Sequence, residues 1–564
     1  MLSVRDRAKA LAAGLYALGS ALFVSCAAYS FHRHIHVDEL TALYSIQLGA
    51  AFGHGDFASI ELGSVLLRPL ARAFGSSQHL FVGFRWYELT LLFGLCLSIA
   101  QVQRALPGAP GRAAAFIGAV SFGPLWRHGF ELRHDMYVAL GIVLLAWAAE
   151  RARSGRASWR VSGITGFGAV LVQANSSKAF AILLPALLLC ALLGARGHRP
   201  WFKRFGLELV RFAPGLLLGA LFVAAVLGQA GMLREYLAQL RQFTNFAAAP
   251  PYRLAAIPLL TFAIERAPVH ALFVALGLLT VAARTIARRD LGAAWVPFGA
   301  FCISALAICV NPTPFPYNLT WLSAAWLLMA AVGAAQCFTL AKRVHRFGAW
   351  ALATLTGAAA LATFFNCEQD PYYRKDWTSQ LRVIAGAEAL TRPDEPVLDL
   401  CGLVVSRPPV AKDWIVHSLL MPAYHAGKRE TVRHIIERVW PPVVVTVYRW
   451  GFLDRPDWAA FRGNYVRFSE DLWTLGSILS PSSTRFNARR SGRYQVRDAN
   501  DAGSIDGRPI HGGDVLWLER GVHAIDAHAR FTLAWTGPGS PQAPPPASNP
   551  LFENGELRGQ RDSK

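Results

Sequence analysis

Apolar residues gather in long runs that recur from residue 10 to about residue 365, with short polar clusters between them. A helix that crosses a membrane needs about 20 mainly apolar residues, so these runs predict a helical membrane bundle with about eleven spans. The predicted spans cover residues 10–31, 80–102, 112–126, 136–150, 160–174, 179–195, 207–230, 268–284, 291–310, 319–339 and 347–365.

The loops between these runs differ in basic charge, and this difference predicts their sidedness. One set of loops holds most of the Lys and Arg residues, for example Arg151, Arg153 and Arg156, whereas the 311–318 loop in the alternate set holds none. Basic loops stay in the cytoplasm, which places the N-terminus inside and residues 366–564 outside. A cleaved signal peptide is the alternative for the first run, but its apolar stretch is longer than a typical signal sequence requires.

Two long outer loops interrupt the predicted spans. Residues 32–79 contain two amphipathic stretches, 38–52 and 58–74, whose apolar positions recur at helical spacing. Helices of this kind lie along a membrane surface. The second loop, about 231–267, contains Pro250-Pro251, which breaks a helix and predicts a mobile flap.

The chain after residue 365 has a different pattern. Residues 366–480 alternate helical stretches with short buried-type strands such as "PVVVTVYR", which predicts an extracytoplasmic α/β domain. Residues 481–537 contain short alternating runs separated by turn residues, typical of a small β-sandwich-like module. The Pro- and Gly-rich residues 538–564 are predicted to be disordered. Residues 1–365 form the predicted membrane module.

Composition supports a membrane protein and argues against a nucleic-acid partner. The chain is 53% hydrophobic and 16% charged, whereas soluble domains carry about a quarter charged residues. Its net charge of +20 comes from short clusters between apolar runs, the pattern that orients spans. The eight cysteines show no CxxC spacing. Cys367 and Cys401 could pair if their region is extracytoplasmic, and the sequence leaves this open.

Polar residues are dense in three of the predicted outer loops. These loops contain His32, His34, His36, Asp38 and Glu39; Arg127, His128, Glu131, Arg133, His134 and Asp135; and Gln173, Asn175 and Lys178. Most polar residues of outer loops are simply solvated. Carboxylates beside a span are costly and usually functional, which makes Asp38, Glu39 and Asp135 candidates for chemistry.

Three alternatives stay open at these positions. Asp38 could cap the N-terminus of a surface helix. The alternating His32, His34, His36 and Asp38 would share one side of an extended segment and could bind a divalent metal, or Asp38 and Asp135 could bind one together. Lys178 could extend its ammonium to lipid headgroups rather than bind a substrate.

Together these features resemble the GT-C class of membrane glycosyltransferases, and within it the branch of protein O-mannosyltransferases and bacterial aminoarabinose transferase. The matching segments are "HVDEL" after the first span, "ELRHDMY" at the fourth span, "NPTPFPYNLTWL" between two late spans, and residues 428–476 of the outer domain. The resemblance covers nearly the whole chain, although each motif is short. The three histidines before Asp38 and the β-type segment 492–536 depart from the family pattern.

The resemblance implies an inverting glycosyltransferase of the bacterial inner membrane. Such an enzyme moves a hexose or pentose from a polyprenyl-phosphate donor to a hydroxyl of a lipid, glycan or protein acceptor. A carboxylate takes the acceptor proton, and cations stabilise the leaving phosphate. The implied site residues are Asp38, Glu39 and Asp135 for catalysis; Lys178, Arg127 and Arg133 for the donor phosphate; His36, Glu131, His134 and Tyr317 for positioning; and Asp38 and Asp135 for a divalent metal ion.

Two rival functions share the membrane setting. A transporter or flippase of lipid-linked glycans would hold its site near the bilayer midplane, whereas the ionisable residues here crowd one face. A polymerase or ligase of surface glycans would share the donor and differ in the acceptor. The sequence does not identify the sugar, the acceptor, the metal dependence or the oligomeric state.

Overall fold

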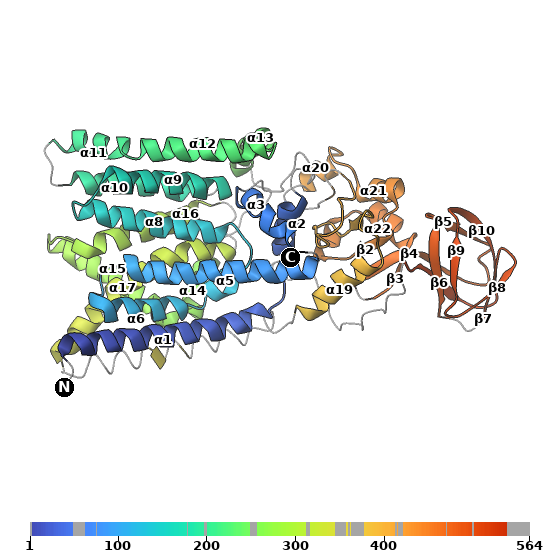
Figure 1. Cartoon of the computed structure of the whole chain (residues 1–564), viewed down its shortest axis with the longest axis horizontal. Coiled ribbons are helices and arrows are strands. Elements are labelled where there is room, and N and C mark those ends of the chain that lie inside the picture. The colour runs from blue at the N-terminus through green and yellow to red at the C-terminus, as the bar shows by residue number, and fades with distance from the viewer. Residues whose placement is uncertain are drawn as a thin grey trace. The chain divides into compact units, whose positions relative to one another are not determined.

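The chain divides into two compact units in the computed structural model (Figure 1). The first unit comprises Met1–Arg33, Glu61–Gly63 and Phe84–Lys375, and the second comprises His34–Ile60, Ser64–Gly83 and Asp376–Lys564. The structure describes residues 3–48, 62–74, 76–176, 179–196, 200–248, 256–311, 316–344, 357–358, 361, 377–411, 414, 421–469, 471–498 and 501–537. The predicted domain boundaries after residues 365, 480 and 537 stay predictions.

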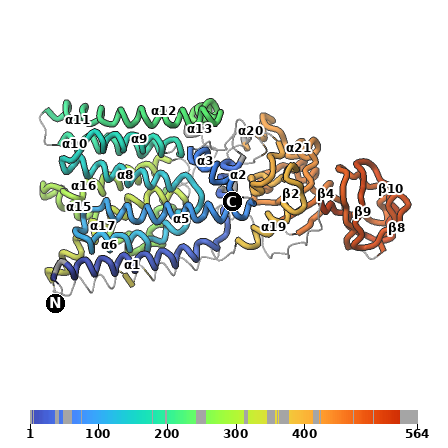
Figure 2. Tube along the Cα trace, in the orientation of Figure 1, coloured from blue at the N-terminus to red at the C-terminus, as the bar shows by residue number. Residues whose placement is uncertain are grey.

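The first unit is a bundle of helices, several of which run alongside one another (Figure 2). Its helices are α1 (Val4–Phe31), α5 (Ser77–Val102, which begins in the second unit), α6 (Gly108–Val120), α7 (Leu125–His128), α8 (Asp135–Arg153), α9 (Trp159–Asn175), α10 (Phe180–Ala195), α11 (Trp201–Val210), α12 (Ala213–Gln229), α13 (Leu233–Ala248), α14 (Ala256–Arg266), α15 (Pro268–Ile286), α16 (Trp295–Val310) and α17 (Leu319–Val344). Short 3₁₀ turns, η3 (Gly292–Ala294) and η4 (Pro316–Asn318), precede α16 and α17.

Six helical segments of the described chain are long and apolar enough to cross a membrane. They are Asp6–Phe31, Ser77–Val102, Trp201–Gln229, Pro268–Ile286, Gly292–Val310 and Leu319–Val344. The protein is therefore an integral membrane protein. Every predicted span from 10–31 to 319–339 overlaps a helix, and the last, 347–365, lies largely outside the described residues. The prediction of a mainly helical membrane bundle is confirmed.

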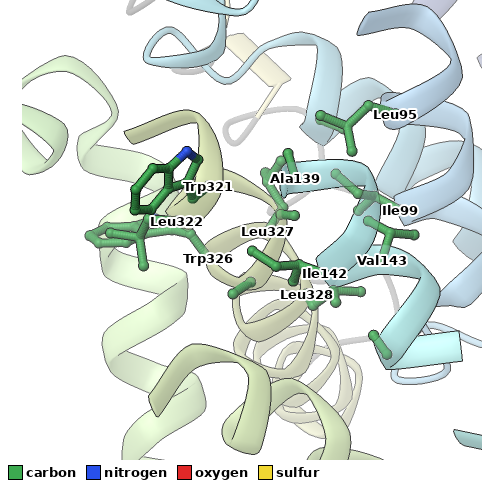
Figure 3. Close-up of a cluster of buried hydrophobic side chains, with 14 of the residues drawn as sticks. Leu95, Ile99, Ala139, Ile142, Val143, Trp321, Leu322, Trp326, Leu327 and Leu328 are labelled. Carbon is green, nitrogen blue, oxygen red and sulfur yellow. The ribbon is translucent and has the colours of Figure 1, made fainter. Parts of the chain in front are cut away.

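Buried apolar side chains of α5, α8 and α17 fill the interior of this bundle (Figure 3). Ala139, Ile142 and Val143 come from α8, and Leu327 and Leu328 come from α17. Small residues let α15 and α17 approach closely, as they commonly do between membrane helices. A Cβ atom added at Gly333 would lie 1.9 Å from the carbonyl oxygen of Phe273, so any larger side chain there would separate the two helices.

The two predicted outer loops contain short helices. In the first loop, α2 (Val37–Leu48), α3 (Leu62–Leu66) and α4 (Arg68–Arg72) cover parts of the predicted amphipathic stretches. In the second loop, α13 and α14 approach the expected break from either side, and Pro250-Pro251 lies outside the described residues.

The second unit combines helices with two sheets. The seven-stranded sheet has the order β1-β2-β4-β11-β6-β9, with β3 also paired to β4, and the four-stranded sheet has the order β5-β10-β7-β8. β1 and β2 are parallel and the other pairs are antiparallel. The strands are β1 (Val397–Leu398), β2 (Val443–Val445), β3 (Tyr465–Arg467), β4 (Leu472–Leu479), β5 (Arg485–Ala488), β6 (Gly492–Arg497), β7 (Asp501–Ile505), β8 (Arg508–His511), β9 (Val515–Leu518), β10 (Gly521–Ala527) and β11 (Phe531–Trp535).

The α/β part and the β-rich part share one continuous sheet, because β11 pairs with β4. The helices of the α/β part are α19 (Thr378–Ala389), α20 (Met421–His425), α21 (Val432–Val439) and α22 (Arg455–Arg462).

Asp506 and Gly507 join β7 to β8 with φ values of 51° and 76°, the conformation that a two-residue hairpin turn favours. Cys367 and the tail after residue 537 lie outside the described residues.

Candidate active site

A cluster of buried polar side chains lies at one end of α8, α16 and α17. Asp135 opens α8, which ends at Arg153, and Leu319 opens α17, whose last turn contains Lys342 and Arg343. The cluster is thus at the helix ends opposite to the basic residues. The distribution of basic residues predicts that this end faces away from the cytoplasm.

Asp135 is held by donors from three segments of the first unit. Its Oδ1 accepts hydrogen bonds from the indole Nε1 of Trp321 at 2.5 Å and from Nδ2 of Asn318 at 3.3 Å. Its Oδ2 accepts a bond from Nε of Arg133 at 3.4 Å. Asp135 is only 2% exposed, and Asn318 and Trp321 are also buried. Charged and polar donors therefore compensate the cost of burying this carboxylate.

Arg133 joins the second carboxylate of the cluster to the first. Its NH1 lies 3.9 Å from Oε2 of Glu131, and the same oxygen is 2.9 Å from Nδ1 of His128. The guanidinium of Arg133 also stacks over the ring of Tyr317, with its Cζ 3.6 Å from the ring centroid. Such an arrangement fixes the position of the cation through both ionic and aromatic contacts.

The arrangement of Asp135 does not favour a metal ligand. Both of its oxygens accept hydrogen bonds from protein donors, whereas a divalent cation needs oxygens that are available for coordination. The described residues include no group of three or more His, Cys, Asp or Glu side chains that could hold a metal ion. Asp38 belongs to the second unit and Asp135 to the first, and their predicted shared metal site stays a prediction.

The end of α1 is fixed by a buried arginine of α5. NH1 of Arg85 donates to the carbonyl oxygens of Ser30, Phe31 and Arg33 at 3.0–3.3 Å. The last carbonyls of a helix lack partners within the helix, and a cation there also matches the helix dipole. Arg33 in turn donates from NH1 to the carbonyl of Trp126 at 2.7 Å. No local sequence pattern indicated this role of Arg85.

The segment that leads into α2 is fixed within the second unit. The side-chain amide of Gln380, in α19, accepts from the Ile35 N–H at 2.7 Å and donates to the Ile35 carbonyl at 3.1 Å. Glu39 then accepts a hydrogen bond from the N–H of His36 at 3.0 Å, the contact that the third helical residue makes in a capping box. Gln380, Ile35 and Glu39 are all buried.

Asp38 is the second residue of α2, and nothing is described of its side chain. The alternative in which Asp38 caps this helix is wrong, because α2 begins at Val37 and His36 occupies the preceding position. The expected extended row of histidines is also wrong. His32 is exposed whereas His34 and His36 are buried, and the helix has begun before Asp38.

Of the other predicted site residues, His134 lies beside Asp135 and Arg127 contacts a different helix. Arg127 is half-buried, and its guanidinium Cζ lies 4.2 Å from the ring centroid of Phe262 in α14. Nε2 of His134 lies 3.9 Å from Asp135. Lys178 lies outside the described residues, whereas Asn175 in the same motif accepts a hydrogen bond from the Gly63 N–H at 2.6 Å.

Besides Arg85, sequence reasoning missed four residues of the contacts described above. Asn318 and Trp321 occur in "NPTPFPYNLTWL", where only Tyr317 was predicted to be a site residue. The sequence signal that could have identified them is an amide and an indole, both hydrogen-bond donors, three residues apart at the start of a span. His128 stood in a recognised polar loop without an assigned role. Gln380 lies about 345 residues from its partner in sequence, so no local pattern reveals it.

Comparison with known proteins gives a weak structural likeness. No family model and no curated protein matches the sequence. Similar solved structures are those of the oligosaccharyltransferase AglB of Archaeoglobus fulgidus. One is in complex with an inhibitory peptide and a dolichol-phosphate; it has a TM-score of 0.48 and 12% identity, covering 81% of this chain and 74% of that chain. The oligosaccharyltransferase of the same organism in complex with Zn and sulfate has a TM-score of 0.44 and 12% identity, covering 82% and 72%.

A third structure, the apo form of that oligosaccharyltransferase, has a TM-score of 0.48 and 13% identity, covering 83% of this chain and 74% of that chain. TM-scores below 0.5 at such identities assign no function. The mannosyltransferase and aminoarabinose transferase branch inferred from the sequence motifs therefore stays a prediction.

Proposed function

We propose that the protein is a membrane glycosyltransferase that moves a sugar from a polyprenyl-phosphate donor to a hydroxyl acceptor at the outer membrane–water face. The observation that carries this proposal is the buried network of Glu131, Arg133 and Asp135 at the non-basic end of an apolar bundle. Ionisable groups are expensive beside lipid and are usually retained for function. A reaction on a lipid-linked donor needs ionisable groups at the end of the bundle where the lipid phosphate meets water.

In the proposed reaction, the acceptor oxygen attacks the anomeric carbon of the donor sugar. A new C–O bond forms, the bond from that carbon to the phosphate oxygen breaks, and the configuration inverts. Asp38 takes the acceptor proton as general base. Arg127, Arg133 and Lys178 offset the charge on the departing polyprenyl phosphate, because preorganised cations stabilise such charge most effectively in a water-poor site.

The remaining residues position these groups. Asp135 holds Arg133, and Tyr317 supports the same guanidinium from its ring face. Glu131 lies 3.9 Å from NH1 of the same guanidinium and also contacts His128. Glu39 and His36 set the first turn of α2 and hence the backbone position of Asp38. His134 and Glu131 are proposed to contact the acceptor or the donor sugar.

Replacement of Asp38 tests the proposed base. Asp38→Asn keeps the size of the side chain and removes its basicity, so transfer from a radiolabelled polyprenyl-phosphate sugar should fall at least about 100-fold. Asp290→Asn, at the basic end of the bundle, is the matched control and should transfer normally. Normal transfer by Asp38→Asn would move the role to Glu39.

Chelation separates the two proposed roles of Asp135. If Asp135 acts by holding Arg133, EDTA should leave transfer intact while Asp135→Ala abolishes it. Loss of transfer in EDTA, with recovery on addition of Mg²⁺ or Mn²⁺, would instead assign Asp135 to a metal.

A further inference from the structure

A cavity of about 330 Å³ lies at the basic end of the helical bundle, among α8, α10, α11 and the start of α16. It is separate from the candidate active site, since Arg153 at the end of α8 lines it and Asp135 opens the same helix. A water molecule occupies about 30 Å³. The cavity is therefore much larger than a site for a single water molecule, and its volume falls at the lower end of the range for small-molecule sites, roughly 300–1,000 Å³.

The charged lining of this cavity has an excess of cations. Arg153, Arg196 and Arg204 line it together with two carboxylates, Glu208 and Asp290. Arg153 is also paired with Glu150, and Glu208 with Arg211, so the charged lining residues and their ion-pair partners comprise four arginines and three carboxylates. Exposed Arg156 lies between the lining residues Gly155 and Ala157. The cavity therefore favours an anionic ligand.

The carboxylates hold the guanidinium groups in place. NH2 of Arg196 lies 3.0 Å from Oδ1 of Asp290, and Nε of Arg204 lies 2.9 Å from Oε1 of Glu208. The Cζ of Arg196 also lies 5.1 Å from the ring centroid of Trp295. A guanidinium has five N–H donors in a planar fork that matches phosphate oxygens, so an arginine that pairs with a carboxylate can bind phosphate as well.

The helix that supplies Arg204 has the character of a membrane-interface helix. Trp201 and Phe202, at the start of α11, are 56% and 59% exposed, and Lys203 and Arg204 follow directly. Exposed aromatic side chains beside cations are typical of the headgroup depth of a bilayer. A ligand in this cavity would therefore meet lipid headgroups first.

We propose that this cavity binds the phosphate of an anionic phospholipid headgroup, with Arg196 and Arg204 as its principal ligands. Basic pockets between membrane helices on the cytoplasmic side commonly hold such headgroups. The bound lipid would join α8, α10, α11 and α16 at the end of the bundle where their basic loops would otherwise repel one another.

Native mass spectrometry of the purified full-length protein in detergent tests this proposal. Phosphatidylglycerol and phosphatidylcholine are the probes, because they share a phosphodiester and differ in net charge. The wild type should retain phosphatidylglycerol preferentially. The double variant Arg196→Gln/Arg204→Gln should bind it about tenfold or more weakly, since each cation near a lipid surface contributes about 1 kcal/mol. The exposed pair Arg288→Gln/Arg289→Gln, outside the cavity lining, is the matched control and should bind like the wild type.

Equal retention of both lipids by the wild type would overturn the proposal, as would equal weakening in the two double variants. Inorganic phosphate that displaces phosphatidylglycerol at low millimolar concentration would overturn the assignment to a lipid. Arg196→Gln alone covers the case in which the double variant fails to fold, because its partner Asp290 is 65% exposed. That single variant should weaken phosphatidylglycerol binding at least threefold, and unchanged binding would contradict the proposal.

Discussion

The carboxylate of Asp135 connects three segments of the first unit, because its two oxygens accept from Trp321, Asn318 and Arg133. The network is buried, so a substitution there leaves charges that water cannot solvate. Breaking one member of a buried ion pair typically costs about 3–5 kcal/mol. The local stability of this end of the bundle thus depends on residues that are also proposed to hold the reacting groups.

Asp135→Asn is expected to lower the unfolding free energy by about 3 kcal/mol or more, because an amide N–H would face the Nε–H of Arg133. The measurement is unfolding of the detergent-solubilised protein in increasing denaturant. Asp290→Asn is the control, and it should change stability by less than about 1 kcal/mol since its ion pair with Arg196 is exposed. Equal, small effects in both variants would show that the Asp135 network is not structural.

Gln380→Leu is expected to loosen the entry to α2 without disturbing α19. The buried N–H and the buried carbonyl oxygen of Ile35 would lose their hydrogen-bond partner, each at a cost of about 1–3 kcal/mol. Hydrogen exchange of residues 34–39 should speed up, and sugar transfer should fall while the KM for the donor changes little. The control Arg382→Leu alters an exposed side chain of the same helix. Unchanged exchange in Gln380→Leu would remove Gln380 as a positioning residue.

At the scale of elements, the hairpin β7–β8 is tied to β10 by a titratable pair. Nδ1 of His523 lies 2.7 Å from Oδ2 of Asp506, and Nε2 lies 2.7 Å from the Glu519 carbonyl oxygen. The bond from His523, with that from the Ala524 N–H, lowers the pKa of Asp506. Burial would lower the pKa of His523, but the contacts with Asp506 and Glu519 outweigh it and raise that pKa.

This pair should protect the hairpin most between about pH 4 and pH 6.5, the ordinary values of the two groups. The contribution of Asp506 is lost as the pH falls through its lowered pKa, and that of His523 is lost as the pH rises through its raised pKa. Hydrogen exchange of residues 501–527, corrected for intrinsic rates, measures this dependence. His523→Gln should flatten the profile and His434→Gln, on α21, should not. A flat profile in the wild type would contradict the assignment.

Elements were predictable where the pattern is local. The apolar runs predict the helices of the bundle, and "SIDGRPI" predicts the β7–β8 hairpin through its Asp-Gly turn. The strand expected from "VLDLCGLVV" is short, because the chain leaves the sheet after Leu398 and Asp399 accepts four backbone N–H bonds from residues 401–404. A buried run alone does not distinguish a strand from such a loop.

At the candidate site, residue types were predictable and partners were not. The position of Asp135 beside a span marked it from sequence, whereas its bonds to Trp321 and Asn318 join residues more than 180 positions apart. The same applies to Gln380 and Ile35. Burial also differs from the prediction for the alternating histidines: one of the three is exposed and two are buried.

At the scale of the whole molecule, the shared sheet couples the β-rich part to the α/β part. Deletion of residues 492–564 removes β11, whose Phe531 and Leu533 are fully buried, and exposes one edge of β4. Unpaired sheet edges are unstable and prone to aggregate. The deletion should therefore make the second unit protease-sensitive while the helices of the first unit stay resistant.

Limited proteolysis followed by mass analysis of the fragments measures the protease resistance of each unit. The control is deletion of residues 538–564 alone, which keeps β11 and should leave both units resistant. Degradation of the first unit in the larger deletion would contradict independent folding of the bundle.

The proposed activity of the protein is transfer of a sugar from a polyprenyl-phosphate donor to a hydroxyl acceptor. The most direct measurement incubates the purified wild-type protein with α- or β-linked polyprenyl-phosphate sugars and a mixture of lipid, glycan and peptide acceptors. The products are identified by mass spectrometry, and the anomeric configuration is determined by NMR. The expected products are polyprenyl phosphate and, in equal amount, a glycosylated acceptor of inverted configuration. Movement of intact donor across vesicle membranes, with no sugar transferred, would contradict it.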